Sequence, residues 1–136
     1  MKTLSKYFQL CGLMSILTFA APVSAGGQFS NEWEIGVSGS ADASGSISFA
    51  LTFKPANDGT ARDPIAIVTS VAADTSKDDI VNLIGNSFSA ALGEDDFDVG
   101  ISWGEHVKVA AEGDTPDFAL TVGRNTLQSV SIEINY

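Results

Sequence analysis

After residue 33, one segment with a helical spacing of apolar residues lies among segments with a strand-like spacing, and this constrains the fold more than any other feature. In most segments every second residue is apolar, which is typical of a strand with one buried face. These segments are 33–37, 47–53, 97–103, 107–111, 118–122 and 130–136. Residues 76–92 instead carry apolar residues at intervals of three and four, which predicts one amphipathic helix. Residues 65–72 are apolar on both faces, which is typical of a central strand covered on both sides.

The order of these segments predicts an α+β domain. It consists of a mainly antiparallel β-sheet of about seven strands packed on one helix. A β-sandwich that carries one helix is the alternative. Residues 38–46 and 55–64 are rich in turn-forming residues and are expected to be loops.

The expected helix has recognisable ends. Thr75 or Ser76 can cap its first turn, and Gly93 suits its C-cap. Gly85 costs about 1 kcal/mol against alanine in mid-helix, and we expect it to allow close contact with the sheet.

The two strands after the helix are expected to form a hairpin. Its register follows from the need to place the apolar residues of both strands on the same face. Side chains directly opposite each other lie on the same face of a sheet. A three-residue loop that ends with His106 pairs Ile101 with Val109 and Trp103 with Val107, which keeps the apolar face intact. This register predicts an exposed hairpin tip at His106.

Residues 1–25 have the features of a secretory signal peptide. Lys2 and Lys6 precede a mostly apolar run at 10–21, and small residues lead to Ala25, where we expect cleavage. The run is too short for a transmembrane helix, and no later segment replaces it. The sequence therefore predicts a single secreted β-rich domain at 26–136 without a transmembrane segment. The expected location is secreted or periplasmic, with the cell surface included.

The charge of the expected mature chain restricts the kinds of partner that it can bind. All 17 acidic residues fall in 26–136, whereas two of the 7 lysines and arginines fall in the leader, so the net charge is 5 minus 17, or −12. An acidic surface repels nucleic acid, so a nucleic-acid partner is not expected. The only cysteine, Cys11, lies in the leader, so the domain is expected to fold without disulfides.

The chain is not expected to be an enzyme. Its one histidine is placed at a loop tip, and nucleophilic catalysis needs a base held in place by a third group. Zinc sites need several histidine or cysteine ligands, and no glycine-rich phosphate loop is present.

Four acids follow the helix, and they are the candidate metal ligands. They are Glu94, Asp95, Asp96 and Asp98. Negative charge at an exposed helix C-terminus is unfavourable by about 0.3–1 kcal/mol, so helix stability does not explain them. They are either a solvated joint or a calcium site, because calcium is bound by several carboxylate oxygens. No cofactor is expected apart from this candidate calcium ion.

Terminal strands are the candidate contact surfaces. We expect residues 28–37 and 130–136 to be edge strands, which pair readily with another chain. The candidate partner-binding residues are Trp33, Ile35, Val130, Ile132 and Tyr136. The aromatic residues Trp33, Trp103 and Tyr136 are either core residues or an exposed strip for contact with a sugar or a partner.

Residues 75–134 resemble a module of flagellin-type and phage-tail structural proteins. The residues that carry the resemblance are Thr75-Ser76, Ile80-Val81, Ala90-Ala91-Leu92, 97–101, 107–109 and 117–122. They are similar to the IN motif of flagellar proteins, a capped helix followed by a short strand, a hairpin and an F-x-L-x-V strand. The resemblance implies a β-rich structural insert and supplies no catalytic or ligand residue. The chain departs from flagellin, because flagellin is not exported with a signal peptide and its coiled-coil ends are missing here.

From these features we expect a secreted, acidic protein with a structural or adhesive function. It would be a subunit of a cell-surface or extracellular assembly, held by self-association or by a protein partner. The alternative is a soluble periplasmic or secreted binding module for calcium or a protein partner.

Overall fold

The computed structural model describes residues 28–136, which form seven strands and one helix. The elements in chain order are β1 (Glu32–Gly39), β2 (Gly45–Phe53), β3 (Ile65–Val71), α1 (Lys77–Ala91), β4 (Phe97–Ser102), β5 (His106–Ala111), β6 (Phe118–Asn125) and β7 (Val130–Asn135). The predicted α+β class is confirmed. The signal-peptide prediction concerns residues 1–25, which lie outside the described residues.

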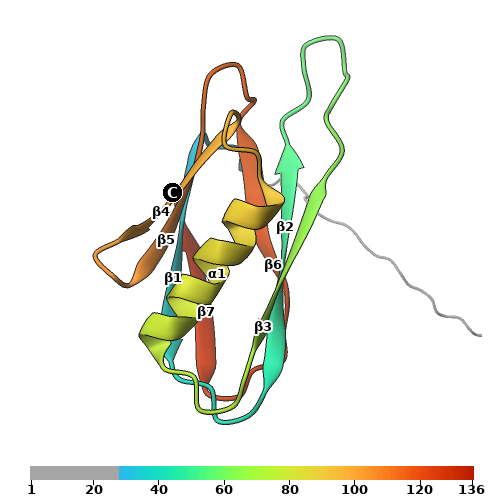
Figure 1. Cartoon of the computed structure of the whole chain (residues 1–136). Helices are drawn as coiled ribbons and strands as arrows, with labels where there is room; N and C mark the ends of the chain where they lie inside the picture. The colour runs from blue at the N-terminus through green and yellow to red at the C-terminus, as the bar shows by residue number, and fades with distance from the viewer. Residues whose placement is uncertain (1–27) are drawn as a thin grey trace, which may run out of the picture.

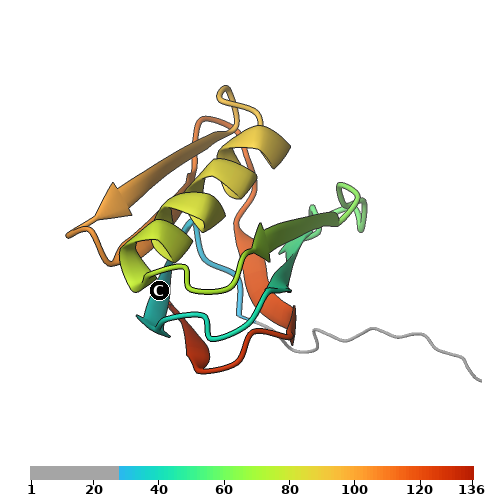
Figure 2. The ribbon, with the colours of Figure 1, turned by 60° about the horizontal axis from the view of Figure 1, so that its bottom comes forward.

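The strands are divided between two antiparallel sheets. One sheet has the order β4-β5-β1-β7 and the other the order β3-β2-β6. Figures 1 and 2 show α1 lying beside β3 and in front of the sheet that contains β1, β5 and β4. The helix therefore covers the open side between the two sheets, next to the outer strands β3 and β4.

The core lies between the two sheets and under α1. The largest fully buried side chains are those of Phe49, Phe88, Phe118, Ile35, Ile47, Leu51, Ile80 and Ile84. Phe88 of α1 meets Phe49 of β2 edge to face, with ring centroids 5.1 Å apart. Fully burying one such side chain stabilises the fold by about 1.5–3 kcal/mol, so this cluster holds the layers together.

The ends of α1 follow from local hydrogen bonds. The Ser76 side chain accepts a hydrogen bond from Asp79 N, which confirms Ser76 as the N-cap. At the other end, Leu92 rather than Gly93 is the C-cap, because Leu92 N donates to Phe88 O and its extended backbone leaves the helix. The chain therefore turns away one residue earlier than expected.

Gly85 confirms the expected close contact between helix and sheet. A Cβ atom at this position would lie 3.0 Å from Ile101 Cδ1 on β4. Glycine therefore lets α1 lie against β4 without displacing the tip of the Ile101 side chain.

The prediction that residues 65–72 form a central strand is wrong. β3 pairs only with β2 among the described strands, and its residues alternate between buried and exposed. Val68, on the outer face, is 59% exposed. The prediction failed because Ala66 and Val68 face outward and are apolar, although no other part of the described structure covers them.

The hairpin between β4 and β5 keeps the predicted faces but not the predicted register. Ile101 is opposite Val107, and Val99 is opposite Val109. The turn occupies Trp103 to Glu105, one residue earlier than expected. Trp103 and Gly104 both have left-handed backbones there, with φ of 59° and 70°.

This earlier turn also corrects two side-chain placements. His106 is the first residue of β5 and is half-buried, so it does not lie at an exposed tip. Trp103 lies in the turn and is 89% exposed, so it is not a core residue. The expected loop at 38–46 is shorter, since β1 extends to Gly39 and β2 begins at Gly45.

Candidate interaction surface

The four-stranded sheet has edge strands at β4 and β7. In the described part of the chain, β4 is paired only with β5, and β7 only with β1. An edge strand leaves backbone N–H and C=O groups unpaired on its outer side, and these groups can hydrogen-bond to another chain. Both sides of the sheet therefore have an edge at which a strand could be added, and at the start of β7 the outer carbonyl of Val130 is already bonded to Asn125 Nδ2 at 2.9 Å.

β1 is not an edge strand, which corrects the expectation for residues 28–37. It lies between β5 and β7 and pairs with both. Its candidate partner-binding residues Trp33 and Ile35 belong to the core, with 6% and 0% of their surface exposed. Trp33 Nε1 donates a buried hydrogen bond of 2.7 Å to Phe118 O. These residues stabilise the fold and cannot reach a partner.

β7 is an edge strand, as expected from its terminal position. Val130 is buried at 7% exposure, and Ile132 is half-buried against the core. Tyr136 follows β7 and is 71% exposed, with its ring centroid 5.0 Å from that of Trp33. Of the five candidate contact residues, Ile132 and Tyr136 lie within reach of a neighbouring molecule.

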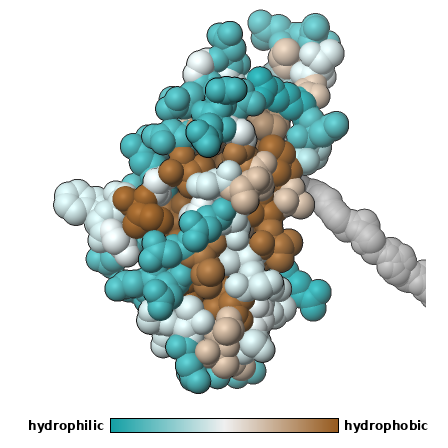
Figure 3. All heavy atoms as spheres, viewed as in Figure 1, coloured by the Kyte–Doolittle hydropathy of each residue, from teal (hydrophilic) through white to brown (hydrophobic). Residues whose placement is uncertain are grey.

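The other edge, β4, was not predicted from the sequence. Ile101 near its end is 43% exposed, and Trp103 directly after it is 89% exposed. Figure 3 shows apolar residues beside the projecting β4–β5 hairpin, whereas the loops at the top of this view are hydrophilic. Gly100 could have signalled this edge, because a glycine inside a strand weakens its packing.

A groove runs between α1 and β4. Asn82, Gly85, Asn86 and Ser89 line it on the helix side. Val99, Gly100 and Ile101 line it on the strand side. Ser89 and Val99 also line an adjoining hollow that includes Glu94, Asp98 and Glu112, so the groove becomes acidic at this end.

An ion pair ties the hairpin tip to the start of α1. Lys77 Nζ lies 3.1 Å from Glu105 Oε1. The hydrogen bond from Lys77 lowers the pKa of Glu105 below its usual value. Because both side chains are largely exposed, the pair orients the tip more than it stabilises the fold.

On the outer face of the sheet, Lys108 of β5 is surrounded by carboxylates. Its Nζ lies 3.0 Å from Glu32 Oε2 of β1. The hydrogen bond to Glu32 raises the pKa of Lys108, and the charges of Asp98 and Glu34 act in the same direction. Lys108 is directly opposite Gly100, which leaves its β4 side without a neighbouring side chain.

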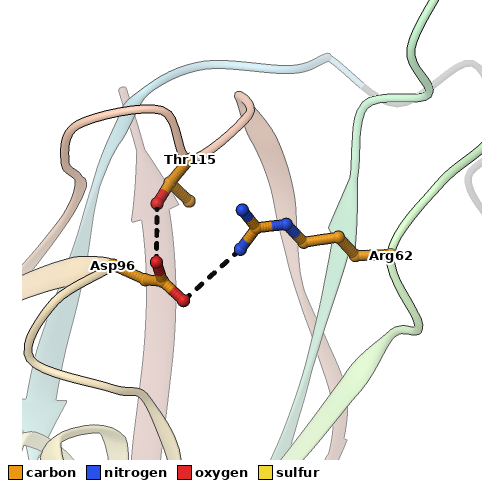
Figure 4. A network of polar contacts seen from close by, with 3 residues as sticks. All are labelled: Arg62, Asp96 and Thr115. Atoms are coloured by element: carbon orange, nitrogen blue, oxygen red, sulfur yellow. Dashed lines mark hydrogen bonds and ion pairs between the residues drawn. The ribbon is translucent and has the colours of Figure 1, made fainter.

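The acids after α1 do not act as one group in the described structure. Asp96 Oδ2 lies 3.4 Å from Arg62 Nη1, and Thr115 Oγ1 donates to Asp96 Oδ1 at 3.3 Å. Figure 4 shows Asp96 between these two residues, each from a different loop. Asp96 O also accepts a hydrogen bond from Glu112 N. Asp96 thus connects the three loops at this end of the fold.

Calcium binding by Glu94, Asp95, Asp96 and Asp98 stays a prediction. Over residues 28–136, no three or more histidine, cysteine or acidic side chains form a group that could hold a metal ion. Among these acids, Asp96 uses both its carboxylate oxygens in contacts within the protein.

Comparison with protein-family models, curated proteins and solved structures gave no match. The resemblance of residues 75–134 to the IN motif therefore stays a prediction. No helix within residues 28–136 combines the length and apolar character needed to cross a membrane.

Proposed function

We propose that this protein is a secreted, non-enzymatic structural or adhesive protein that makes its contacts through β4 and β7. One observation carries the proposal. Each of the two edge strands of the four-stranded sheet is followed directly by a largely exposed aromatic residue, Trp103 after β4 and Tyr136 after β7.

This combination favours binding by strand addition. The unpaired backbone groups of an edge strand supply hydrogen bonds without sequence specificity, and neighbouring side chains supply specificity. Tryptophan and tyrosine are enriched at protein interfaces, because they bury a large area and keep a polar group for a hydrogen bond. The structural insert implied by the IN-motif resemblance agrees with this role.

Secretion and assembly can be tested on the full chain, expressed in cells that can process its leader. Fractionation would show whether the protein is recovered from the medium, the cell surface or the periplasm. Light scattering on the purified protein, with calcium and with a chelator, would show whether it forms large species. We expect surface-bound or released protein that forms large species or adheres to cells.

Two variants and a matched control test the role of the edges. Trp103→Ser and Tyr136→Ser remove the exposed aromatic rings, and we expect each to reduce assembly or adhesion at least several-fold. Val68→Ser removes a comparably exposed apolar side chain from β3, and we expect it to behave as the wild type. Equal behaviour of all four proteins, or a purely periplasmic monomer that binds no cell surface, would contradict the proposal. The second result would favour the soluble binding module.

A further inference from the structure

We infer that the partner of each edge is a second copy of this chain, with β4 of one molecule pairing head to tail with β7 of the next. This inference rests on the proposed function and names the partner of the same two edges. It is carried by the strand directions, by the side chains on each face and by the groove beside β4.

The strand directions allow such an assembly to continue indefinitely. All neighbours in the four-stranded sheet are antiparallel, so β4 and β7 run in opposite directions. A second copy in the same orientation therefore presents β7 antiparallel to β4 of the first. A contact between two different surfaces of this kind does not close on itself unless the rotation between copies forms a ring.

The faces of the strands limit the register. Val99 and Ile101 of β4 lie on the core side, opposite the buried residues Val109 and Val107. In β7, Ile132 and Ile134 lie on the core side, opposite Val37 and Ile35 of β1. A shift of one residue would turn the apolar residues of the added strand outward, so only shifts of two residues are allowed.

Two of the allowed registers give the longest overlap between β4 and β7 of the second copy, and the charged residues favour one of them. In one of them, Asp98 is directly opposite Glu133 of the second copy, and like charges in this position are unfavourable. In the other, Asp98 is opposite Asn135, Gly100 is opposite Glu133, and Ile101 is opposite Ile132. We assign the second register.

This register also places opposite charges near each other across the contact. Lys108 of β5 is directly opposite Gly100 of β4. Gly100 is therefore the only residue between Lys108 and Glu133 of the second copy. The two residues are two strand spacings apart, about 9.5 Å between strand axes. Lys108 is 44% exposed and paired with Glu32, so in this register it would share its charge between Glu32 and that carboxylate.

The groove between α1 and β4 provides room for the added strand. Ile132 and Ile134 of the second copy would lie on the helix side of the sheet, facing a wall formed by Asn82, Asn86 and Ser89. This wall carries no charge, and its amide and hydroxyl groups must keep hydrogen-bond partners when the added strand covers them. Tyr136 of the second copy reaches the level of Phe97, and Trp103 reaches the level of Val130, so both exposed aromatic residues lie at the ends of the contact.

A symmetric dimer through two β4 strands is less favourable. It would leave β7 unpaired and Tyr136 exposed on both molecules. The net charge of −12 over residues 26–136 opposes any self-association, because copies repel each other. Salt shortens the range of this repulsion to about 8 Å at physiological strength and about 3 Å at 1 M, so we expect assembly to increase with sodium chloride.

A charge pair tests the register directly. Gly100→Glu places a carboxylate opposite Glu133 of the second copy, and a like-charge pair weakens each contact about 1.5- to 5-fold. The double variant Gly100→Glu/Glu133→Lys replaces the repulsion by attraction and is expected to restore assembly. The dissociation constant of each protein is measured by sedimentation velocity over a range of sodium chloride concentrations.

Position 100 accepts these substitutions in the monomer. A Cβ atom there meets no atom within 4 Å, and the backbone of Gly100 is not left-handed. Gly100→Ala controls for the loss of glycine. Thermal unfolding of each variant controls for folding, including any new contact between the introduced carboxylate and Lys108.

The outcomes separate this inference from the proposed function. Restoration by Glu133→Lys supports head-to-tail pairing in this register. Weakening by Gly100→Glu without restoration overturns the pairing with β7 but leaves the β4 edge as a contact surface. A wild-type protein that stays monomeric in all salts overturns self-association. The proposed function then depends on whether adhesion is lost in Trp103→Ser.

Discussion

The replacement of Trp33 by phenylalanine tests whether this residue stabilises the fold rather than a partner contact. Trp33 is 6% exposed, and its Nε1 donates to Phe118 O at 2.7 Å. Phenylalanine keeps most of the ring but loses this donor. Phe118 O still accepts from Ser30 N at 3.0 Å, so the carbonyl is not left without a partner.

The expected loss of stability is therefore the net value of one hydrogen bond plus the cost of a small void. A typical buried hydrogen bond contributes about 0.5–1.5 kcal/mol, and the two ring carbons lost with the nitrogen cost about 0.8 kcal/mol each. We expect the free energy of unfolding to fall by about 2–3 kcal/mol, measured by urea denaturation with far-ultraviolet circular dichroism.

Trp103→Phe is the matched control, because the same change is made at an 89% exposed position. We expect it to change the free energy of unfolding by less than about 0.5 kcal/mol. Equal effects of the two substitutions would refute the assignment of Trp33 to the core. Trp33→Phe also leaves Trp103 as the only tryptophan, so a blue shift of its fluorescence would report burial of the hairpin tip on assembly.

Three further predictions concern the core, the loops and pH. Phe88→Ala is expected to cost about 3–5 kcal/mol in urea denaturation, because Phe88 is fully buried against Phe49; a loss below that of Trp33→Phe would contradict this. Asp96→Asn is expected to lower stability by less than about 1 kcal/mol in thermal unfolding, since its ion pair is exposed; a larger loss would show that this residue does more than connect loops. The pKa of Glu105 is lowered by Lys77, so the contact stabilises the fold above the unfolded pKa and is lost as the pH falls through the folded pKa. In Lys77→Gln we expect the Glu105 titration, followed by NMR, to move to higher pH, and an unchanged midpoint would disprove the contact.

Periodicity was a reliable guide to the elements themselves. It located seven strands and one helix, and the capping serine at 76 and the close approach at Gly85 followed from local chemistry. Such features depend on residues a few positions apart, so a single sequence contains the information needed for them.

Periodicity was a poor guide to the order of the strands. β1 was expected at an edge because it comes first in the chain, but β5 and β7 enclose it. The expectation that β3 is central failed for a related reason, since an apolar residue such as Val68 can face outward. Which strands lie side by side depends on contacts between distant segments, and local alternation does not record them.

The candidate interaction surface was also predictable only where it depends on local sequence. Chain position pointed to residues 130–136, but the edge at β4 and its groove with α1 exist only once the helix has packed beside that strand. Trp103 alternates correctly for a strand, yet the turn begins there, because Trp103 and Gly104 adopt left-handed backbones.

The sequence by itself determined the helix, the strands, the buried face of the strands with alternating apolar residues and the acidic charge of the domain. These depend on local spacing and on composition. Only the tertiary structure decided which strands are edges and which aromatic residues are exposed. Burial depends on residues that are distant in the sequence, because the whole core forms together. In the folded domain such residues cover Trp33, whereas Trp103 stays in solvent.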